Sequence, residues 1–126
     1  MLDKSVKILV ILASTLLLVS GIRWLVDPAG SAAGLGMPLL DGIGRSSQIG
    51  DLSAFFLVAG GFGLLGVLRG NATLLYTPAA LVGAAAVLRI LATLLHDAGL
   101  ATQLIAVEAV LLVIFVAGAQ RAQRIP

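Results

Sequence analysis

The stretch LLYTPAALVGAAAVLRILATLLHDAGLATQLIAVEAVLLVIFVAGA, residues 74–119, decides the fold. It contains two apolar runs, about 74–95 and 100–119, separated only by the four residues 96–99. A helix needs about 20 apolar residues to cross the hydrocarbon core of a bilayer. Each run has that length, so we predict two antiparallel transmembrane helices joined by a tight turn. Glycine favours the end of a helix, and we expect Gly99 to occupy the C-cap position of the first of them.

Two further apolar runs precede this hairpin. The first covers residues 8–26, and the second covers residues 47–68. Serine is a favourable N-cap, so we expect the second helix to begin at Ser46 or Ser47. Pro78 is expected in the first turn of the third helix, where its missing N–H is not needed.

The segment between the first two runs, residues 27–50, reads differently. Asp27-Pro28 interrupts the first helix, because proline disfavours the helical conformation of the residue before it. The segment is rich in glycine yet also contains leucine, isoleucine and methionine. We therefore predict a long loop that lies in the membrane interface or folds over the mouth of the bundle.

The composition excludes a water-soluble fold. Hydrophobic residues make up 60% of the chain and charged residues 11%, with a mean hydropathy of +1.12. A soluble domain has about 45–50% apolar and about 25% charged residues. We predict a single integral membrane domain, residues 1–126, which is an all-α, up-down-up-down four-helix transmembrane bundle.

The absence of cysteine and the distribution of charge exclude other classes. Without cysteine the chain forms no disulfide, thiolate metal site or thiol redox relay. A net charge of +2 would favour nucleic acid in a soluble protein, but here the basic residues lie at the ends of the predicted spans. We therefore expect no nucleic-acid partner.

The basic residues also predict the orientation in the membrane. Arg45 is the only one that lies clearly in the loops of one side. The other side has five: Lys4, Lys7, Arg69, Arg121 and Arg124. Because positive residues favour the cytoplasmic side, we expect both termini in the cytoplasm and the long loop outside.

Stripes of small residues follow the helical repeat on the second and third predicted helices. Such stripes allow helix backbones to approach closely in lipid. They predict packing within the bundle or, alternatively, a homo-oligomer. The members are Ala59, Gly63, Gly66 and Gly70 on the second helix, and Ala79, Gly83 and Ala86 on the third.

Arg89 and Glu108 are ionisable residues inside apolar runs. A charge at the centre of a span costs about 2.5–3.5 kcal/mol. Both lie about ten residues from the turn near Gly99, so at 1.5 Å per residue they reach the same depth and can pair. Such a pair fixes the register of two helices, binds a ligand, or takes part in catalysis or proton transfer. The sequence leaves these roles open.

Other polar residues gather toward the same end of the predicted bundle. His96 follows Arg89 on one face of the third helix, and Asp51 lies near the start of the second. We therefore name Arg89, Glu108, His96 and Asp51 as candidate ligand-binding residues. A single histidine without cysteine does not form a convincing metal site, and we predict neither metal nor cofactor. Arg23, Trp24 and Asp27 are typical of a membrane interface, with Trp24 in the aromatic belt.

The order of a loop with Gly34-Leu35-Gly36-Met37-Pro38, the polar helix start at residues 45–52 and a glycine-rich second helix resembles small four-span bacterial proteins, distantly DoxX-like. The resemblance implies a multi-pass protein of the inner membrane and no particular chemistry. The cysteines of some DoxX-like proteins are absent here, which argues against thiol redox activity.

Two functional hypotheses follow. The first is a protein that binds a lipid or small amphiphile in a polar pocket of its outer half, with membrane lipids as partners and without a predicted catalytic residue. The second is an accessory or assembly subunit of a larger membrane complex, in which the small-residue stripes are docking faces. Proton-coupled transport fits less well, because a neighbouring arginine keeps a glutamate ionised.

Overall fold

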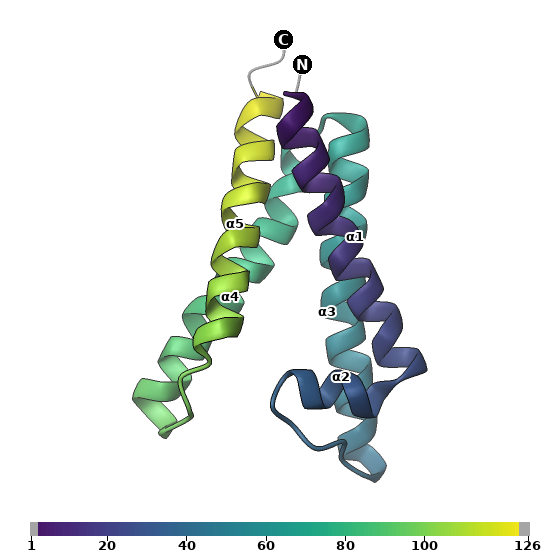
Figure 1. Cartoon of the computed structure of the whole chain (residues 1–126), viewed down its shortest axis with the longest axis vertical. Helices are drawn as coiled ribbons and strands as arrows, with labels where there is room; N and C mark the ends of the chain where they lie inside the picture. The colour runs from purple at the N-terminus through teal and green to yellow at the C-terminus, as the bar shows by residue number, and fades with distance from the viewer. Residues whose placement is uncertain (1–2, 124–126) are drawn as a thin grey trace.

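A computed structural model of the chain describes residues 3–123, which contain five helices and no strand (Figure 1). Four of the helices are long and apolar enough to span a membrane. The all-α, up-down-up-down bundle is therefore confirmed, and the chain is an integral membrane protein. The helices are α1 (Lys4–Val26), α2 (Pro28–Gly34), α3 (Gly42–Arg69), α4 (Ala72–His96) and α5 (Thr102–Gln123).

The four long helices form two pairs, α1 with α3 and α4 with α5. The pairs meet at the end where α1 begins and α5 ends, which we call the terminal end (Figure 1). They diverge toward the opposite end, the open end, which carries α2 and the turn between α4 and α5. The core joins the pairs near the terminal end, where Val10, Leu75 and Phe115 are fully buried.

Glycine allows α1 and α3 to cross closely. A Cβ atom at Gly60 would lie 2.7 Å from the backbone nitrogen of Leu18 and 2.7 Å from the carbonyl oxygen of Ser14. Gly63 and Gly66 are also buried, against Phe115 and Leu75 respectively. These contacts confirm the predicted packing within the bundle, because short-range contact holds helices together in lipid.

The predicted stripes are confirmed in part. Ala79 is buried, and Gly83 faces Leu112 of α5, where an added Cβ would lie 3.3 Å from the leucine side chain. Gly70 does not belong to the packed stripe. It is exposed at the C-cap of α3 with a φ angle of 59°, a left-handed conformation that glycine adopts without strain.

The second transmembrane helix begins earlier than predicted. Ser46 and Ser47 do not cap it, because α3 starts at Gly42 and both serines lie inside the helix. Arg45 stabilises this extra turn. Its Nε donates to the carbonyl oxygen of Leu40 over 2.8 Å, and its Nη2 donates to Asp41 over 3.1 Å.

The predicted loop 27–50 contains the short helix α2. Pro28 occupies its first turn, and the Asp27 carboxylate accepts a hydrogen bond from the Gly30 N–H over 3.1 Å. Gln48 holds the segment after α2, because it accepts from the Leu40 N–H over 2.8 Å and donates to the Pro38 carbonyl over 3.0 Å. The segment is therefore folded against the open end.

Both ends of α4 also differ from the prediction. The Asn71 side chain caps α4 by accepting from the Leu74 N–H over 3.1 Å, so the helix starts at Ala72 and Pro78 lies in its second turn. At the other end, Asp97 and not Gly99 adopts the left-handed C-cap conformation, with a φ angle of 55°. Aspartate tolerates this conformation better than most residues, and α4 therefore ends before the glycine.

Candidate functional site

Arg89 of α4 and Glu108 of α5 form the ion pair that the sequence predicts. The Nε of Arg89 donates to both carboxylate oxygens, over 2.9 Å and 3.2 Å. The arginine side chain is 30% exposed and the glutamate side chain 12%. The helices are antiparallel and joined by a short turn, so residues equally far from the turn meet at the same depth.

This pairing uses only one nitrogen of the guanidinium. Arginine carries five N–H donors, and four of them are on the two Nη atoms. Within residues 3–123, neither Nη atom of Arg89 donates to a protein acceptor. Arg89 is 30% exposed and lines an open cleft, so these four donors are accessible to water or to the oxygens of a bound molecule.

Arg89 lines an open cleft of about 870 Å³ at the open end. We call it the polar cleft. Residues 33–36, at the end of α2 and just after it, form one wall, and residues 98–104, from the α4–α5 turn and the start of α5, form the other. The residues that line the cleft also include the polar residues Thr102 and Gln103. The arginine thus faces a space large enough for a small molecule or a lipid headgroup.

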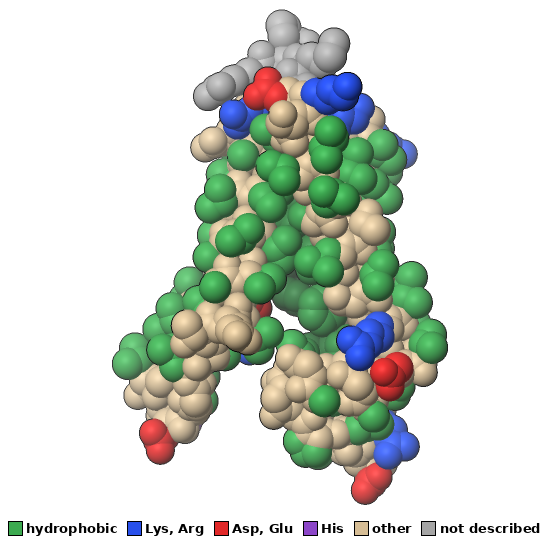
Figure 2. Space-filling view, in the orientation of Figure 1, with side chains coloured by type: hydrophobic (Ala, Val, Ile, Leu, Met, Phe, Trp, Pro, Cys, Tyr) green, Lys and Arg blue, Asp and Glu red, His purple; other side chains and the backbone are tan. Residues whose placement is uncertain are grey.

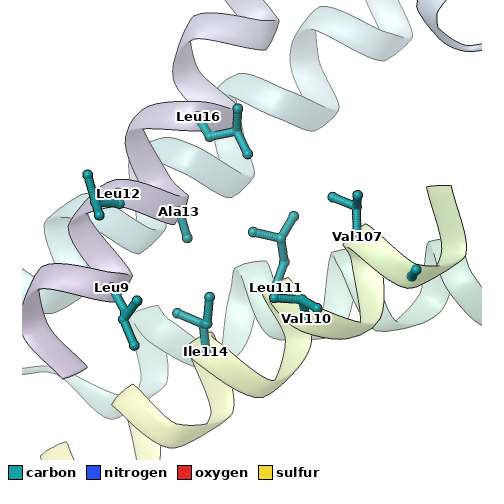
Figure 3. Close-up of a pocket in the computed structure, with 9 residues that line it drawn as sticks. Leu9, Leu12, Ala13, Leu16, Val107, Val110, Leu111 and Ile114 are labelled. Carbon is teal, nitrogen blue, oxygen red and sulfur yellow. The ribbon is translucent and has the colours of Figure 1, made fainter. Parts of the chain in front are cut away.

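A second space, which we call the apolar groove, lies between α1 and α5 and has a volume of about 400 Å³ (Figure 3). Its lining is purely aliphatic: Leu9, Leu12, Ala13 and Leu16 from α1, and Ala106, Val107, Val110, Leu111 and Ile114 from α5. Leu9 and Ile114 face each other at its narrow end, and the helices separate toward Leu16 and Val107. The groove therefore widens toward the open end.

The polar cleft and the apolar groove follow one face of α5. Leu104 lines the cleft, and Val107 and Leu111 line the groove. Spacings of three and four residues place these side chains one above the other on a helix. Figure 2 shows the hollow between the α1–α3 pair and the α4–α5 pair, with hydrophobic side chains along its upper walls.

The other two predicted site residues lie elsewhere. His96 is the last residue of α4 and is exposed, and Asp51 is exposed on α3. Neither lines the polar cleft or the apolar groove. Among residues 3–123 there is also no group of three side chains suited to hold a metal ion. The structure thus joins Arg89 to Glu108 and adds two segments that the sequence analysis did not assign to the site, residues 33–36 and 98–104.

A smaller pocket of about 160 Å³ lies between α1, α2 and α3. Arg23 lines it and forms an ion pair with Asp27, at 3.6 Å between Nη2 and Oδ2. Trp24 is only 1% exposed, so it packs between the helices and does not form the expected aromatic belt. Ser31 is buried at its edge, and its hydroxyl has no hydrogen-bond partner among the described residues.

These features define a four-span helical membrane protein whose last two spans share an intramembrane ion pair beside an open cleft. Comparison with protein-family models, curated proteins and solved structures found no match for this chain. The resemblance to DoxX-like proteins therefore stays a prediction, and the function has to be argued from the site.

Proposed function

We propose that this protein binds a lipid or small amphiphile in the polar cleft and holds an oxygen of its headgroup on Arg89. The observation that carries the proposal is the guanidinium geometry. Glu108 accepts hydrogen bonds only from Nε of Arg89. The four N–H donors on the two Nη atoms have no acceptor among the described residues, and Arg89 lines the cleft. Carboxylate and phosphate oxygens match such a pair of nitrogens with two parallel hydrogen bonds.

Glu108 has a positioning role in this proposal. Its carboxylate fixes the plane of the guanidinium through two contacts to Nε and leaves the outer edge of the group available. The pair carries no net charge, so an anionic headgroup would leave the site with one uncompensated negative charge. That charge is tolerable because the cleft is open at the end of the bundle, where water and headgroups lie.

We further propose that the termini lie in the cytoplasm and that the cleft faces the outer leaflet. The basic residues of the open end outside the Arg89–Glu108 pair are Arg23 and Arg45, each paired with an aspartate four residues away. Arg124 lies outside the described residues. The described basic residues of the terminal end are Lys4, Lys7, Arg69 and Arg121, of which Arg121 is paired with Asp3. Figure 2 shows Lys and Arg side chains gathered at that end. This excess favours the terminal end as the cytoplasmic side.

The test is thermal unfolding of the purified chain in a neutral detergent with added dodecyl phosphate. Wild-type protein is expected to gain several degrees in Tm, because a ligand that binds only the folded state stabilises it. Arg89→Lys keeps the positive charge beside Glu108 but loses the planar pair of nitrogens, so it should lose most of the gain. Arg69→Lys, at the exposed end of α3, is the matched control and should keep it. Equal gains in both variants would contradict the proposal.

An accessory subunit is the second candidate. The observation that favours it is the exposure of the open half of α4, where Leu94 and Leu95 are 74% and 70% exposed and no described helix covers them. If the chain is such a subunit, extraction in a mild detergent should yield a complex of fixed stoichiometry by native mass spectrometry. Extraction of the chain alone favours the binding protein.

A further inference from the structure

We infer that the ligand is an anionic amphiphile with a single acyl chain, whose headgroup binds Arg89 and whose chain lies in the apolar groove between α1 and α5. This inference rests on the proposed function, because it takes Arg89 as the headgroup site. It adds the class of the ligand and a second part of its binding site.

The first argument is the chemistry of the groove. Its nine lining residues are aliphatic, and polar atoms contribute almost nothing to its surface. Large side chains on both of its walls are exposed, with Leu12 at 61% and Val110 at 60%. A hydrocarbon chain between them would restore the close packing that a protein interior normally has.

The second argument is size. A methylene group takes up about the same room as a water molecule, roughly 30 Å³, so the groove of about 400 Å³ holds on the order of a dozen of them. That is the bulk of one long acyl chain. Only one chain of a two-chain phospholipid would fit in the groove, and the second chain would lie outside it. The narrow end between Leu9 and Ile114 also suits the tip of one chain.

The third argument is the arrangement of charge. The groove widens toward the open end, and the face of α5 that lines it continues through Leu104 into the polar cleft. Arg89 lines that cleft and is its only charged side chain among the described residues. An aliphatic groove that leads to the Nη donors of one guanidinium matches one carboxylate or phosphate at the head of one chain through hydrogen bonding, while Glu108 already balances the charge of Arg89.

The experiment is a titration of the full-length protein in detergent, followed by native mass spectrometry. The probes are palmitate, the neutral alcohol hexadecanol with the same chain, and dipalmitoyl phosphatidylglycerol with an anionic head and two chains. We expect one palmitate per chain, bound about tenfold more tightly than hexadecanol, a difference of ~1.4 kcal/mol. The phosphatidylglycerol should bind more weakly than palmitate.

Two tryptophan variants distinguish palmitate binding in the groove from a general effect of a large side chain on the surface of the bundle. Val110→Trp fills the groove and should raise the Kd for palmitate about tenfold, a loss typical of an obstructed apolar pocket. Val87→Trp is the matched control, since Val87 is 56% exposed on α4 and lines neither the groove nor the cleft. It should leave the Kd unchanged. Both positions are exposed, so both variants are expected to fold.

The outcomes distinguish the inference from the proposed function. If Val110→Trp binds palmitate as tightly as wild type, or if the phosphatidylglycerol binds as tightly as palmitate, the single-chain site is wrong. The headgroup site still stands in that case, provided that Arg89→Lys abolishes the preference for palmitate over hexadecanol. If Arg89→Lys retains that preference, the proposed function fails and the inference fails with it.

Discussion

The ion pair between Arg89 and Glu108 allows a quantitative test by a double-mutant cycle. Two unit charges about 4 Å apart attract each other by ~4 kcal/mol at the effective dielectric constant of ~20 that suits protein sites. Removing one partner of a buried pair typically costs about 3–5 kcal/mol. The Arg89 side chain is 30% exposed toward the cleft, so water weakens the interaction. We therefore expect a coupling energy of ~2 kcal/mol, below the range for a fully buried pair.

The exposed fractions also predict an asymmetry between the single variants. Glu108 is only 12% exposed, so Arg89→Ala leaves a carboxylate that water reaches poorly. Glu108→Ala leaves an arginine that already borders the cleft and has a long flexible stem. Arg89→Ala should therefore cost about 3 kcal/mol and Glu108→Ala about 2 kcal/mol. The double variant should cost ~3 kcal/mol, because its two losses are not additive.

The assay is equilibrium unfolding of the purified protein in mixed micelles with increasing sodium dodecyl sulfate, followed by circular dichroism. The free energies of unfolding of wild type, both single variants and the double variant give the coupling energy directly. Losses that add within about 0.5 kcal/mol would show that the two side chains act independently. In that case the ion pair between Arg89 and Glu108 would not act as a unit, and the headgroup site proposed from it would lose its support.

Three further predictions test the fold. Gly60→Ala should lower the free energy of unfolding by about 1–3 kcal/mol, because the added Cβ would meet the backbone of α1. Gly61→Ala should be neutral or stabilising by up to ~1 kcal/mol, because a Cβ at this position points into open space. Equal losses would refute the close crossing. A cysteine at Gly99 should react with a membrane-impermeant thiol reagent in intact cells and one at Ser5 should not; the reverse pattern would invert the proposed orientation. Gln48→Ala should speed hydrogen exchange of the Leu40 amide, and an unchanged rate would mean that Gln48 does not hold this segment.

The four spans and the ion pair could be predicted because both depend on local properties of the chain. Hydropathy marks the spans, and a short turn places residues at equal distances from it side by side, which is why Arg89 and Glu108 could be paired by counting. The close crossing at Gly63 also follows from a small-residue repeat. These features need no knowledge of how the two helix pairs are arranged.

The helix ends were harder to predict because several residues are compatible both with the end of one helix and with the start of another. Asp27-Pro28 ends α1, yet the same two residues supply the N-cap and first turn of α2. Ser46 suits an N-cap, but nothing before it stops a helix, and the bonds of Arg45 to Leu40 and Asp41 stabilise an earlier start. Competition between adjacent capping residues is decided by tertiary contacts, which a sequence pattern does not contain.

The sequence predicted a polar pocket that contains Arg89, but neither the walls of the polar cleft nor the apolar groove could be predicted. They exist because the α1–α3 and α4–α5 pairs diverge toward the open end, and no residue pattern encodes that divergence. It is also the reason why His96 and Asp51, which the sequence groups with Arg89, do not line the cleft. The segments that do line it, residues 33–36 and 98–104, lie far apart in the sequence.

The ion pair between α4 and α5 has a consequence for biosynthesis. Arg89 leaves the ribosome before Glu108, which follows 19 residues later. Until then α4 carries a lone cation, at a cost of about 2.5–3.5 kcal/mol if it enters the bilayer by itself. Once α5 is made, the two helices form a neutral hairpin. We therefore expect the translocon to release α4 and α5 into lipid together, as one neutral hairpin.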